Sequence, residues 1–301
     1  MSWLEAITSS IKYMEEHLTE DITAAQVAQS VNISSLYFQK GFSILCDIPV
    51  SEYLRHRRLS LAGRDLRING YKVIDVALKY GYDSPDSFTK AFTRFHGITP
   101  VQAKLGEGKL REFLPLKLHV SMKGGFNTEC KIIKKSAFTV IGSAKIIAGN
   151  EGFAKCPKFW NQHFASGDGK YICGMYGICI DNPSDGVPME DKSYSKEKME
   201  AQNCFKYLIA DDYDSDREYP AKFVKEVIPE NTWAVFPCKG PMPSAMQDVY
   251  QQIYKEWLPQ NPDYEVSGMY NIEKYSDASK LSKGNQDENY YSEIWIPVKA
   301  K

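Results

Sequence analysis

The sequence predicts two domains of different fold class: an all-α N-terminal domain, in which a linker helix joins two helix-turn-helix units, and an α+β C-terminal domain. Apolar positions recur at helical spacing through residues 1–108, whereas period-two strand patterns alternate with helices from residue 126 onward. A chain of 301 residues is long enough for two packed cores. We expect the domains at residues 1–108 and 126–301, with residues 109–125 as the linker.

The stretch from Val73 to Pro100 has the pattern of two short helices joined by a tight turn. Gly81 suits the turn because it adopts positive φ without strain, and Pro85 suits the first turn of the following helix. Apolar residues form a stripe on each helix: Val73, Val76, Ala77 and Tyr80, then Phe88, Ala91, Phe92 and Phe95. The second helix is left with a polar and basic free face, as in a helix-turn-helix that enters a DNA major groove.

A second copy of this pattern lies about fifty residues earlier, from Val27 to Leu54. Its Phe38 and Phe42 match Phe88 and Phe92 of the later copy. An arginine-rich helix, expected over residues 51–69, connects the copies, and an amphipathic helix at residues 2–18 precedes them.

This duplicated motif resembles the DNA-binding domain of the AraC/XylS family of bacterial transcription regulators. The resemblance implies a sequence-specific DNA-binding protein in which two recognition helices reach successive major-groove faces, so that one chain binds an asymmetric site as a monomer. Matching positions imply base-edge contacts from Leu36, Gln39 and Lys40 in the first unit and from Ser87, Thr89 and Lys90 in the second. Asp86 falls at a matching position too, where it either caps its own helix or accepts a hydrogen bond from a cytosine amino group.

Positive charge is concentrated around the linker helix and the second unit, although the formal net charge of the chain is only −1. Residues 53–112 carry twelve Lys and Arg against six Asp and Glu, which is the electrostatic footprint expected for phosphate binding. Phosphate contacts fix the position of a protein along the duplex but do not read the base sequence. The candidates for such contacts are Arg55, Arg57, Arg58, Arg94 and Lys104.

The C-terminal region reads as strand, helix, strand, strand, followed by a second such set, which predicts an antiparallel sheet with helices on one face. Strands are expected at residues 128–147, 172–181, 205–211, 222–227, 233–237 and 290–298, and helices at 155–164 and 245–257. Residues 182–199 and 276–289 are expected to be polar loops. This order and the ending YYSEIWIPV resemble the GyrI-like effector-binding domain of Rob-type regulators.

The final strand places Glu293 between Tyr291 and Trp295 on one face, with Ile294 and Ile296 on the other. A carboxylate in an aromatic cleft favours a cationic partner, and aromatic faces also attract cations. The resemblance likewise implies a sensor glutamate at this place. We therefore expect a pocket for a small, lipophilic or cationic effector; the alternative is a glutamate that faces water on an edge strand.

Further aromatic residues are candidates for the pocket lining, and each could instead belong to the core. They are Trp160, Tyr176, Tyr207 and Trp233. Two other functions remain open at this point. One is a GyrI-like hydrolase of reactive small molecules that pairs Glu293 with Tyr176 or Tyr207, and the other is a C-terminal module that binds a partner protein.

The seven cysteines are scattered and show no CxxC spacing, which indicates reduced thiols rather than disulfides or a zinc site. We expect no cofactor, no bound metal and no enzymatic activity. The sequence shows neither a signal peptide nor an apolar run that could span a membrane, so a cytoplasmic location is expected. Double-stranded DNA, a small-molecule effector and RNA polymerase are the expected partners, with activation of transcription as the family's usual outcome.

Overall fold

The computed structural model describes residues 2–118, 129–148, 152–181 and 204–301. The chain divides into two compact units. Unit 1 comprises residues 1–32 and 46–121, and unit 2 comprises residues 33–45 together with 122–301. The polar loop expected at residues 182–199 and the last part of the expected linker lie outside the described residues.

All the regular elements described in the N-terminal region are helices, which confirms the all-α prediction. Its helices are α1 (Trp3–Glu16), α2 (Ala24–Ser30), α3 (Ser35–Cys46), α4 (Val50–Ile68), α5 (Val73–Lys79), α6 (Pro85–His96) and α7 (Pro100–Lys104). Residues 33–45, which form nearly all of α3, group with the sheet of unit 2 rather than with unit 1. Helix α3 is therefore described with that sheet.

Short-range capping explains where several of these helices begin. Thr23 and Thr99 form capping boxes with Gln26 and Gln102, so that side chains satisfy backbone amides that the first turn leaves without a partner. Ser84 caps α6 by accepting a hydrogen bond from the Ser87 amide. These signals are local, which is why the sequence predicted the helix-turn-helix elements.

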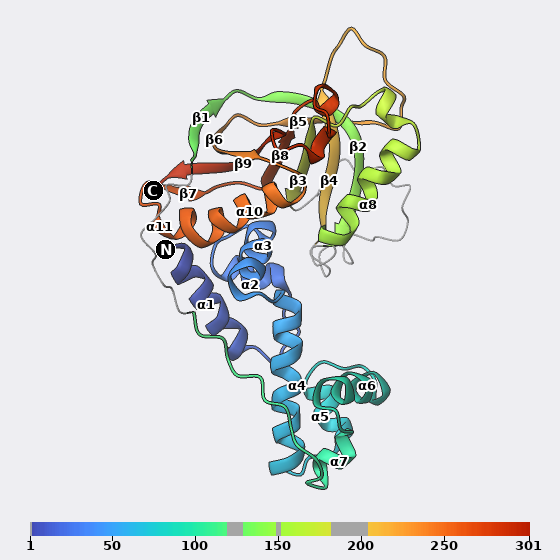
Figure 1. Ribbon diagram of the computed structural model, residues 1–301. Coiled ribbons are helices and arrows are strands. Elements are labelled where there is room, and N and C mark those ends of the chain that lie inside the picture. The colour runs from blue at the N-terminus through green and yellow to red at the C-terminus, as the bar shows by residue number, and fades with distance from the viewer. Residues whose placement is uncertain (1, 119–128, 149–151, 182–203) are drawn as a thin grey trace. The chain divides into compact units, whose positions relative to one another are not determined.

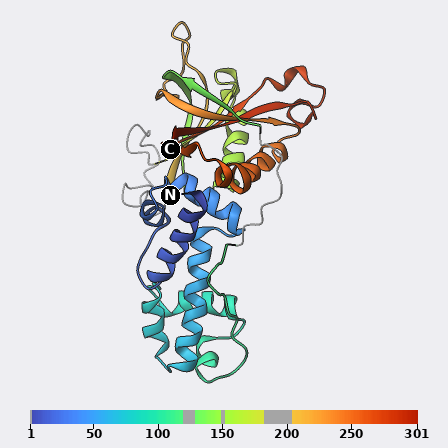
Figure 2. The ribbon, with the colours of Figure 1, turned by 90° about the vertical axis from the view of Figure 1, so that its left-hand side faces the viewer.

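Helix α4 is the spine of unit 1, with α1 beside one end and α5 to α7 beside the other (Figure 2). At the second end, apolar side chains from α4 to α7 form one core: Leu59, Ala62, Leu66, Val76, Ala77, Tyr80, Phe88, Phe92, Phe95 and Ala103. At the first end, the Arg57 guanidinium binds both carboxylate oxygens of Glu15, at 2.8 and 2.7 Å. The amphipathic pattern predicts the apolar core at the second end of α4, but it does not predict the Arg57–Glu15 ion pair at the first end.

His96 is buried where α6 crosses α4. Its Nε2 lies 2.9 Å from the Leu59 carbonyl oxygen, and its Nδ1 accepts the Arg111 amide at 3.1 Å, which fixes a neutral imidazole with the proton on Nε2. A Cβ at Gly63 would lie 2.9 Å from the His96 ring, so the close helix crossing requires glycine. Burial lowers the pKa of His96, and the positive charges of Arg67 and Arg111 lower it further.

Unit 2 contains a nine-stranded antiparallel sheet among its described residues, which confirms the α+β prediction (Figure 1). The strands are β1 (Lys131–Lys135), β2 (Phe138–Ala148), β3 (Tyr176–Asp181), β4 (Cys204–Asp212), β5 (Val224–Ile228), β6 (Asn231–Lys239), β7 (Tyr264–Val266), β8 (Tyr270–Tyr275) and β9 (Tyr291–Ala300). Their order is β1-β6-β9-β8-β3-β4-β2-β5, and β7 pairs with β9. The helices are α8 (Gly152–Ala165) and α10 (Ser244–Gln252), which continues through a π-helical turn (Ile253–Trp257) into α11 (Leu258–Gln260).

The expected duplication is visible in the strand order. The set β2-α8-β3-β4 corresponds to β6-α10-β8-β9, and the two sets meet where β3 pairs with β8 at the centre of the sheet. Strands β7 and β8 were not among the strands expected from the sequence. The sequence therefore predicted neither the central strand β8 nor the face of the sheet on which its side chains lie.

The two faces of the sheet are filled differently. One face carries the main apolar core, with Trp233 and Ile178 fully buried and Trp295 nearly so. The other face is covered by α8 and α10 (Figure 1), and carries Tyr207 from β4 and Glu273 from β8. The candidate ligand site depends on which of these faces a side chain occupies.

The buried neutral His96 predicts a specific pH dependence of stability. Because its pKa is lower in the folded chain than in the unfolded chain, the folded state binds fewer protons, and stability is lost as the pH falls below about 6.5. We expect the free energy of unfolding, measured by urea titration, to fall between about pH 7.5 and pH 5.5 more steeply in the wild type than in His96→Gln. Equal slopes for the two chains would contradict this assignment.

Candidate nucleic-acid interface and ligand cleft

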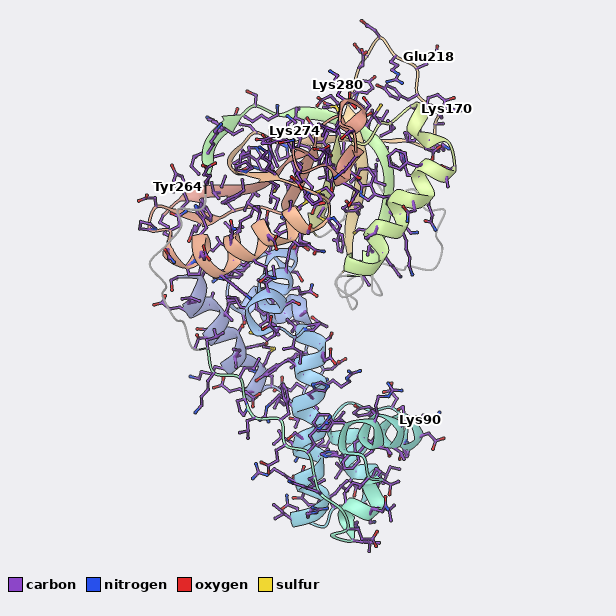
Figure 3. All side chains as sticks on the ribbon, in the orientation of Figure 1. Lys90, Lys170, Glu218, Tyr264, Lys274 and Lys280 are labelled. Atoms are coloured by element: carbon purple, nitrogen blue, oxygen red, sulfur yellow. The ribbon has the colours of Figure 1, made fainter. Side chains whose placement is uncertain are left out.

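Helix α6 presents the free face expected of a recognition helix. Phe88, Phe92 and Phe95 are buried beneath it, while Ser87, Lys90 and Arg94 are exposed. Thr89 is half-buried, and Asp86 is exposed in the first helical turn. Figure 3 shows Lys90 projecting from α6. The second set of predicted base-contact residues therefore lies on a polar, accessible helix surface, with Ser84 rather than Asp86 as the cap.

The candidate phosphate contacts divide into exposed and internal side chains. Arg55, Arg94 and Lys104 are exposed, and Arg55 lies 3.0 Å from the Glu52 carboxylate. Arg57 is buried against Glu15 and also donates to the Phe113 carbonyl oxygen. Arg58 donates to the carbonyl oxygens of Leu18 and Glu20, at 2.8 and 2.6 Å. The expectation for Arg57 is therefore corrected: its guanidinium is used inside the fold.

The predicted effector residues are split between the two faces of the sheet. The register pairs Ile272 with Trp295 and Lys274 with Glu293, so Glu293, Trp295 and Tyr291 share the face of the main core. Tyr176 and Trp233 belong to that same face. Tyr207 lies on the opposite face and accepts a hydrogen bond from Trp160 Nε1 at 2.9 Å. The structure therefore does not bring Tyr207 to Glu293, and that hydrolase pairing is excluded.

Glu293 does lie between the two expected aromatic residues. Its carboxylate accepts the Tyr291 hydroxyl at 2.8 Å and Trp295 Nε1 at 2.7 Å. The ring of Trp295 already has two ammonium groups near it, from Lys274 at 5.4 Å and Lys135 at 5.9 Å. The positive charge of these two ammonium groups disfavours a further cation beside Glu293.

The helix-covered face carries a different carboxylate, that of Glu273 on β8. The hydroxyl of Tyr250 in α10 lies 2.9 Å from Glu273 Oε1, and that of Tyr275 lies 2.8 Å from Oε2. The pair Trp160 and Tyr207 completes one wall, since the rings of Trp160 and Tyr275 meet edge to face at 5.3 Å. We call this cluster of side chains, formed by Glu273, Tyr250, Tyr275, Tyr207 and Trp160, the ligand cleft, after the function proposed for it below.

Gly177 on β3 gives these groups their close approach at the centre of the sheet. It is paired with Glu273 in the register, and a Cβ there would lie 2.5 Å from the Tyr207 hydroxyl oxygen and 3.3 Å from Glu273 Oε2. Any larger residue would displace one of these two groups. The absence of a side chain at Gly177 thus helps to place a carboxylate next to three phenolic hydroxyls.

The electrostatics of the ligand cleft favour a positive occupant. Burial raises the pKa of Tyr207, Tyr250 and Tyr275, and the neighbouring charge of Glu273 raises each of them further, so the three hydroxyls stay protonated. No ion pair among the described residues includes Glu273. A half-buried carboxylate surrounded by aromatic rings is the chemistry that selects organic cations.

Helix α3 lies against this same cleft, within unit 2. Leu36 packs on the cluster of Ile147, Phe205, Tyr207 and Ile209, and Lys40 Nζ lies 3.1 Å from the centroid of the Tyr250 ring. In this structure, the two residues that the resemblance implies as base contacts therefore contact other side chains of unit 2. Gln39 donates to Ser35 Oγ at 3.0 Å, along its own helix.

Glu273, Tyr250 and Tyr275 were missed by the sequence reasoning. The residues NIEKY have the period-two alternation of a strand, and this signal places Glu273 and Tyr275 on one face. The alternation is short and lies just after Gly268 and Met269, in a region to which the sequence analysis assigned no helix or strand. The strand would have been found by asking which segment of the second repeat corresponds to β3.

Comparison with known proteins agrees with both halves of this description. Residues 27–104 match the family model "Helix-turn-helix domain", and residues 131–298, more than half of the chain, match "Integron-associated effector binding protein". The transcriptional activator AarP of Providencia stuartii is 31% identical over 115 residues, which is 38% of this chain and 85% of AarP. The regulatory protein SoxS of Salmonella typhimurium is 32% identical over 100 residues, which is 33% of this chain and 94% of SoxS.

Among solved structures, SAV2435 bound to tetraphenylphosphonium is similar to this chain at 20% identity and a TM-score of 0.42. The match covers 57% of this chain and 94% of that one.

The helical elements and the duplicated sheet define a two-part transcription regulator with an effector-binding domain. The chain belongs to the AraC-type helix-turn-helix regulators, and residues 131–298 belong to the integron-associated, GyrI-like effector-binding proteins. None of its described helices combines the length and the apolar character needed to cross a bilayer.

The exposed face of α6 predicts a measurable contribution of Lys90 to DNA binding. We expect Lys90→Ala to weaken binding to a duplex selected by the full chain from random sequences by about 1–3 kcal/mol if it contacts a base edge. The measurement is fluorescence anisotropy at fixed salt, with Lys170→Ala as the control, because Lys170 is an exposed lysine of unit 2. Unchanged affinity of Lys90→Ala would remove α6 from the proposed interface.

Proposed function

We propose that this chain is a sequence-specific regulator of promoters whose C-terminal domain binds a small organic cation. The observation that carries the effector part is the position of Glu273, a half-buried carboxylate held by two tyrosine hydroxyls inside an aromatic cleft. The DNA part rests on the family and on the exposed polar and basic face of α6 above its buried phenylalanines.

The base-contact residues remain as first proposed on α6, namely Ser87, Thr89 and Lys90. On α3 they are Leu36, Gln39 and Lys40, and these can reach DNA only when the helix is turned away from the cleft. Arg94, Lys104 and Arg55 are the proposed phosphate contacts, because their charged groups are exposed. Each such contact contributes to affinity in a salt-dependent manner.

The effector class follows from the chemistry of the cleft. Glu273 supplies one negative charge, and the rings of Tyr250, Tyr275 and Trp160 supply π faces and edges. This combination favours an amphipathic molecule with a single positive charge and an apolar body. It disfavours anions, which the negative charge of Glu273 would repel.

We propose Glu273 as the effector-binding carboxylate, together with Trp160 and Tyr207 from the original set. Glu293, Tyr291, Trp295, Tyr176 and Trp233 form the competing proposal on the opposite face. Lys274 and Lys135 beside Trp295 weigh against this second site. A cation that bound there would have to approach two ammonium groups.

The two candidate carboxylates can be separated by matched substitutions. We expect Glu273→Gln to weaken binding of n-hexylammonium or tetraphenylphosphonium to the full chain at least about tenfold, because it removes the charge while it keeps the shape of the side chain. Glu293→Gln should retain most of the affinity. Isothermal titration calorimetry measures both.

The reverse result, with affinity lost in Glu293→Gln and kept in Glu273→Gln, would move the effector to the core face. Binding of neither cation to any variant, including those in which α3 is loosened as described below, would overturn the effector proposal. The DNA proposal is tested separately through Lys90.

We further propose that one chain binds one asymmetric site in the cytoplasm and activates transcription through RNA polymerase. The presence of both helix-turn-helix units in one chain supports monomeric binding. The naming of AarP as an activator supports the sign of regulation. We expect sedimentation equilibrium with a selected duplex to give one chain per duplex, and a stoichiometry of two would contradict the monomeric mode.

A further inference from the structure

Helix α3 occupies the ligand cleft with a lysine, and this position has consequences for regulation. Lys40 Nζ lies 3.1 Å from the centroid of the Tyr250 ring, and the Tyr250 hydroxyl in turn lies 2.9 Å from Glu273. Lys40 is thus a primary ammonium on an apolar stem, placed over an aromatic face beside a carboxylate. It has the chemical features that the cleft would recognise in an effector.

Polar and apolar contacts also hold the rest of α3 in place within unit 2. The Leu36 amide donates to Asp181 Oδ2 at 2.9 Å, and the Tyr37 hydroxyl donates to the Tyr270 carbonyl oxygen at 2.6 Å. The Leu36 side chain packs against the buried cluster of Ile147, Phe205, Tyr207 and Ile209, and Phe159 and Trp160 of α8 pack against the same cluster. The contact therefore spans β3, β4, β8 and α10.

Keeping the Lys40 charge in this position has a cost. Burial lowers the pKa of Lys40, and the negative charge of Glu273 opposes that shift. The carboxylate thus helps to hold the docked ammonium. The same charge would attract a free cation once α3 had left.

We propose that α3 is an internal competitor of the effector: Lys40 fills the ligand cleft, and a primary ammonium compound on a slender apolar stem displaces it and frees α3 for DNA. This inference rests on the proposed function and adds the mode of regulation and the ligand class. Leu36 and Lys40 are used both for packing in the ligand cleft and for the proposed base contacts. They cannot contact the cleft and base edges at the same time. The docked and DNA-bound arrangements of α3 are therefore mutually exclusive.

The first arm of the test measures DNA affinity without any added cation. Glu273→Gln removes the charge that attracts Lys40, so α3 is released more often, and the full chain should bind its selected duplex about tenfold more tightly than the wild type. Glu218→Gln, which changes an exposed carboxylate in a loop of unit 2, is the matched control and should leave the affinity unchanged. Equal affinity of Glu273→Gln and wild type overturns the proposal.

The second arm measures the affinity of the full chain for n-hexylammonium. Lys40→Met keeps the apolar stem but removes the competing ammonium, so the cation should bind several-fold more tightly, whereas Lys170→Met should bind it as the wild type does. Unchanged affinity in Lys40→Met contradicts competition.

The two proposals fail in different ways. Cation binding that depends on Glu273, combined with unchanged DNA affinity in Glu273→Gln, would retain the effector site and reject the role of α3. Tighter DNA binding in Glu273→Gln, with no cation bound by Lys40→Met, would retain the docked helix and reject the cationic effector.

Discussion

A carboxylate placed among aromatic rings requires a positive charge, and this requirement organises unit 2. Glu273 lies where the two halves of the duplicated sheet meet, opposite Gly177 and between the hydroxyls of Tyr250 and Tyr275. Hydrogen bonds from the two hydroxyls offset part of the cost of burying the charge, and a cation must offset the rest. In this structure Lys40 of α3 places its ammonium group over the Tyr250 ring.

In the proposed scheme, this constraint connects DNA binding and effector binding through one helix. The segment that the sequence assigns to base reading is also the segment that contacts the effector domain. A ligand can shift such an equilibrium only if it binds one arrangement better than the other. Competition for the ligand cleft provides that difference without any long pathway through the protein, since the same side chains are used in both arrangements.

Local patterns predicted the fold and part of the site. The aromatic stripe and the exposed face of α6 were predicted because both follow from helical periodicity and short-range caps. Arg57 was misread because its partner Glu15 is forty-two residues away, and no local signal distinguishes a buried guanidinium from a phosphate ligand. The hydrophobic pattern of the sheet was also predicted, including Ile294 on the face opposite Glu293.

The ligand cleft could not be predicted because it depends on pairing between distant segments. Glu273 gains its role only when β8 pairs with β3, and only when α8 and α10 cover that face. The glutamate of the terminal motif was more conspicuous because its two aromatic neighbours adjoin it in sequence.

The most direct test of this account is the coupling between cation and DNA. Calorimetric titration of n-hexylammonium into the full chain, with and without a saturating amount of the selected duplex, measures it in one experiment. Because DNA should hold α3 away from the cleft, the cation should bind about tenfold more tightly to the DNA complex. Equal or weaker affinity in the presence of DNA would contradict the account.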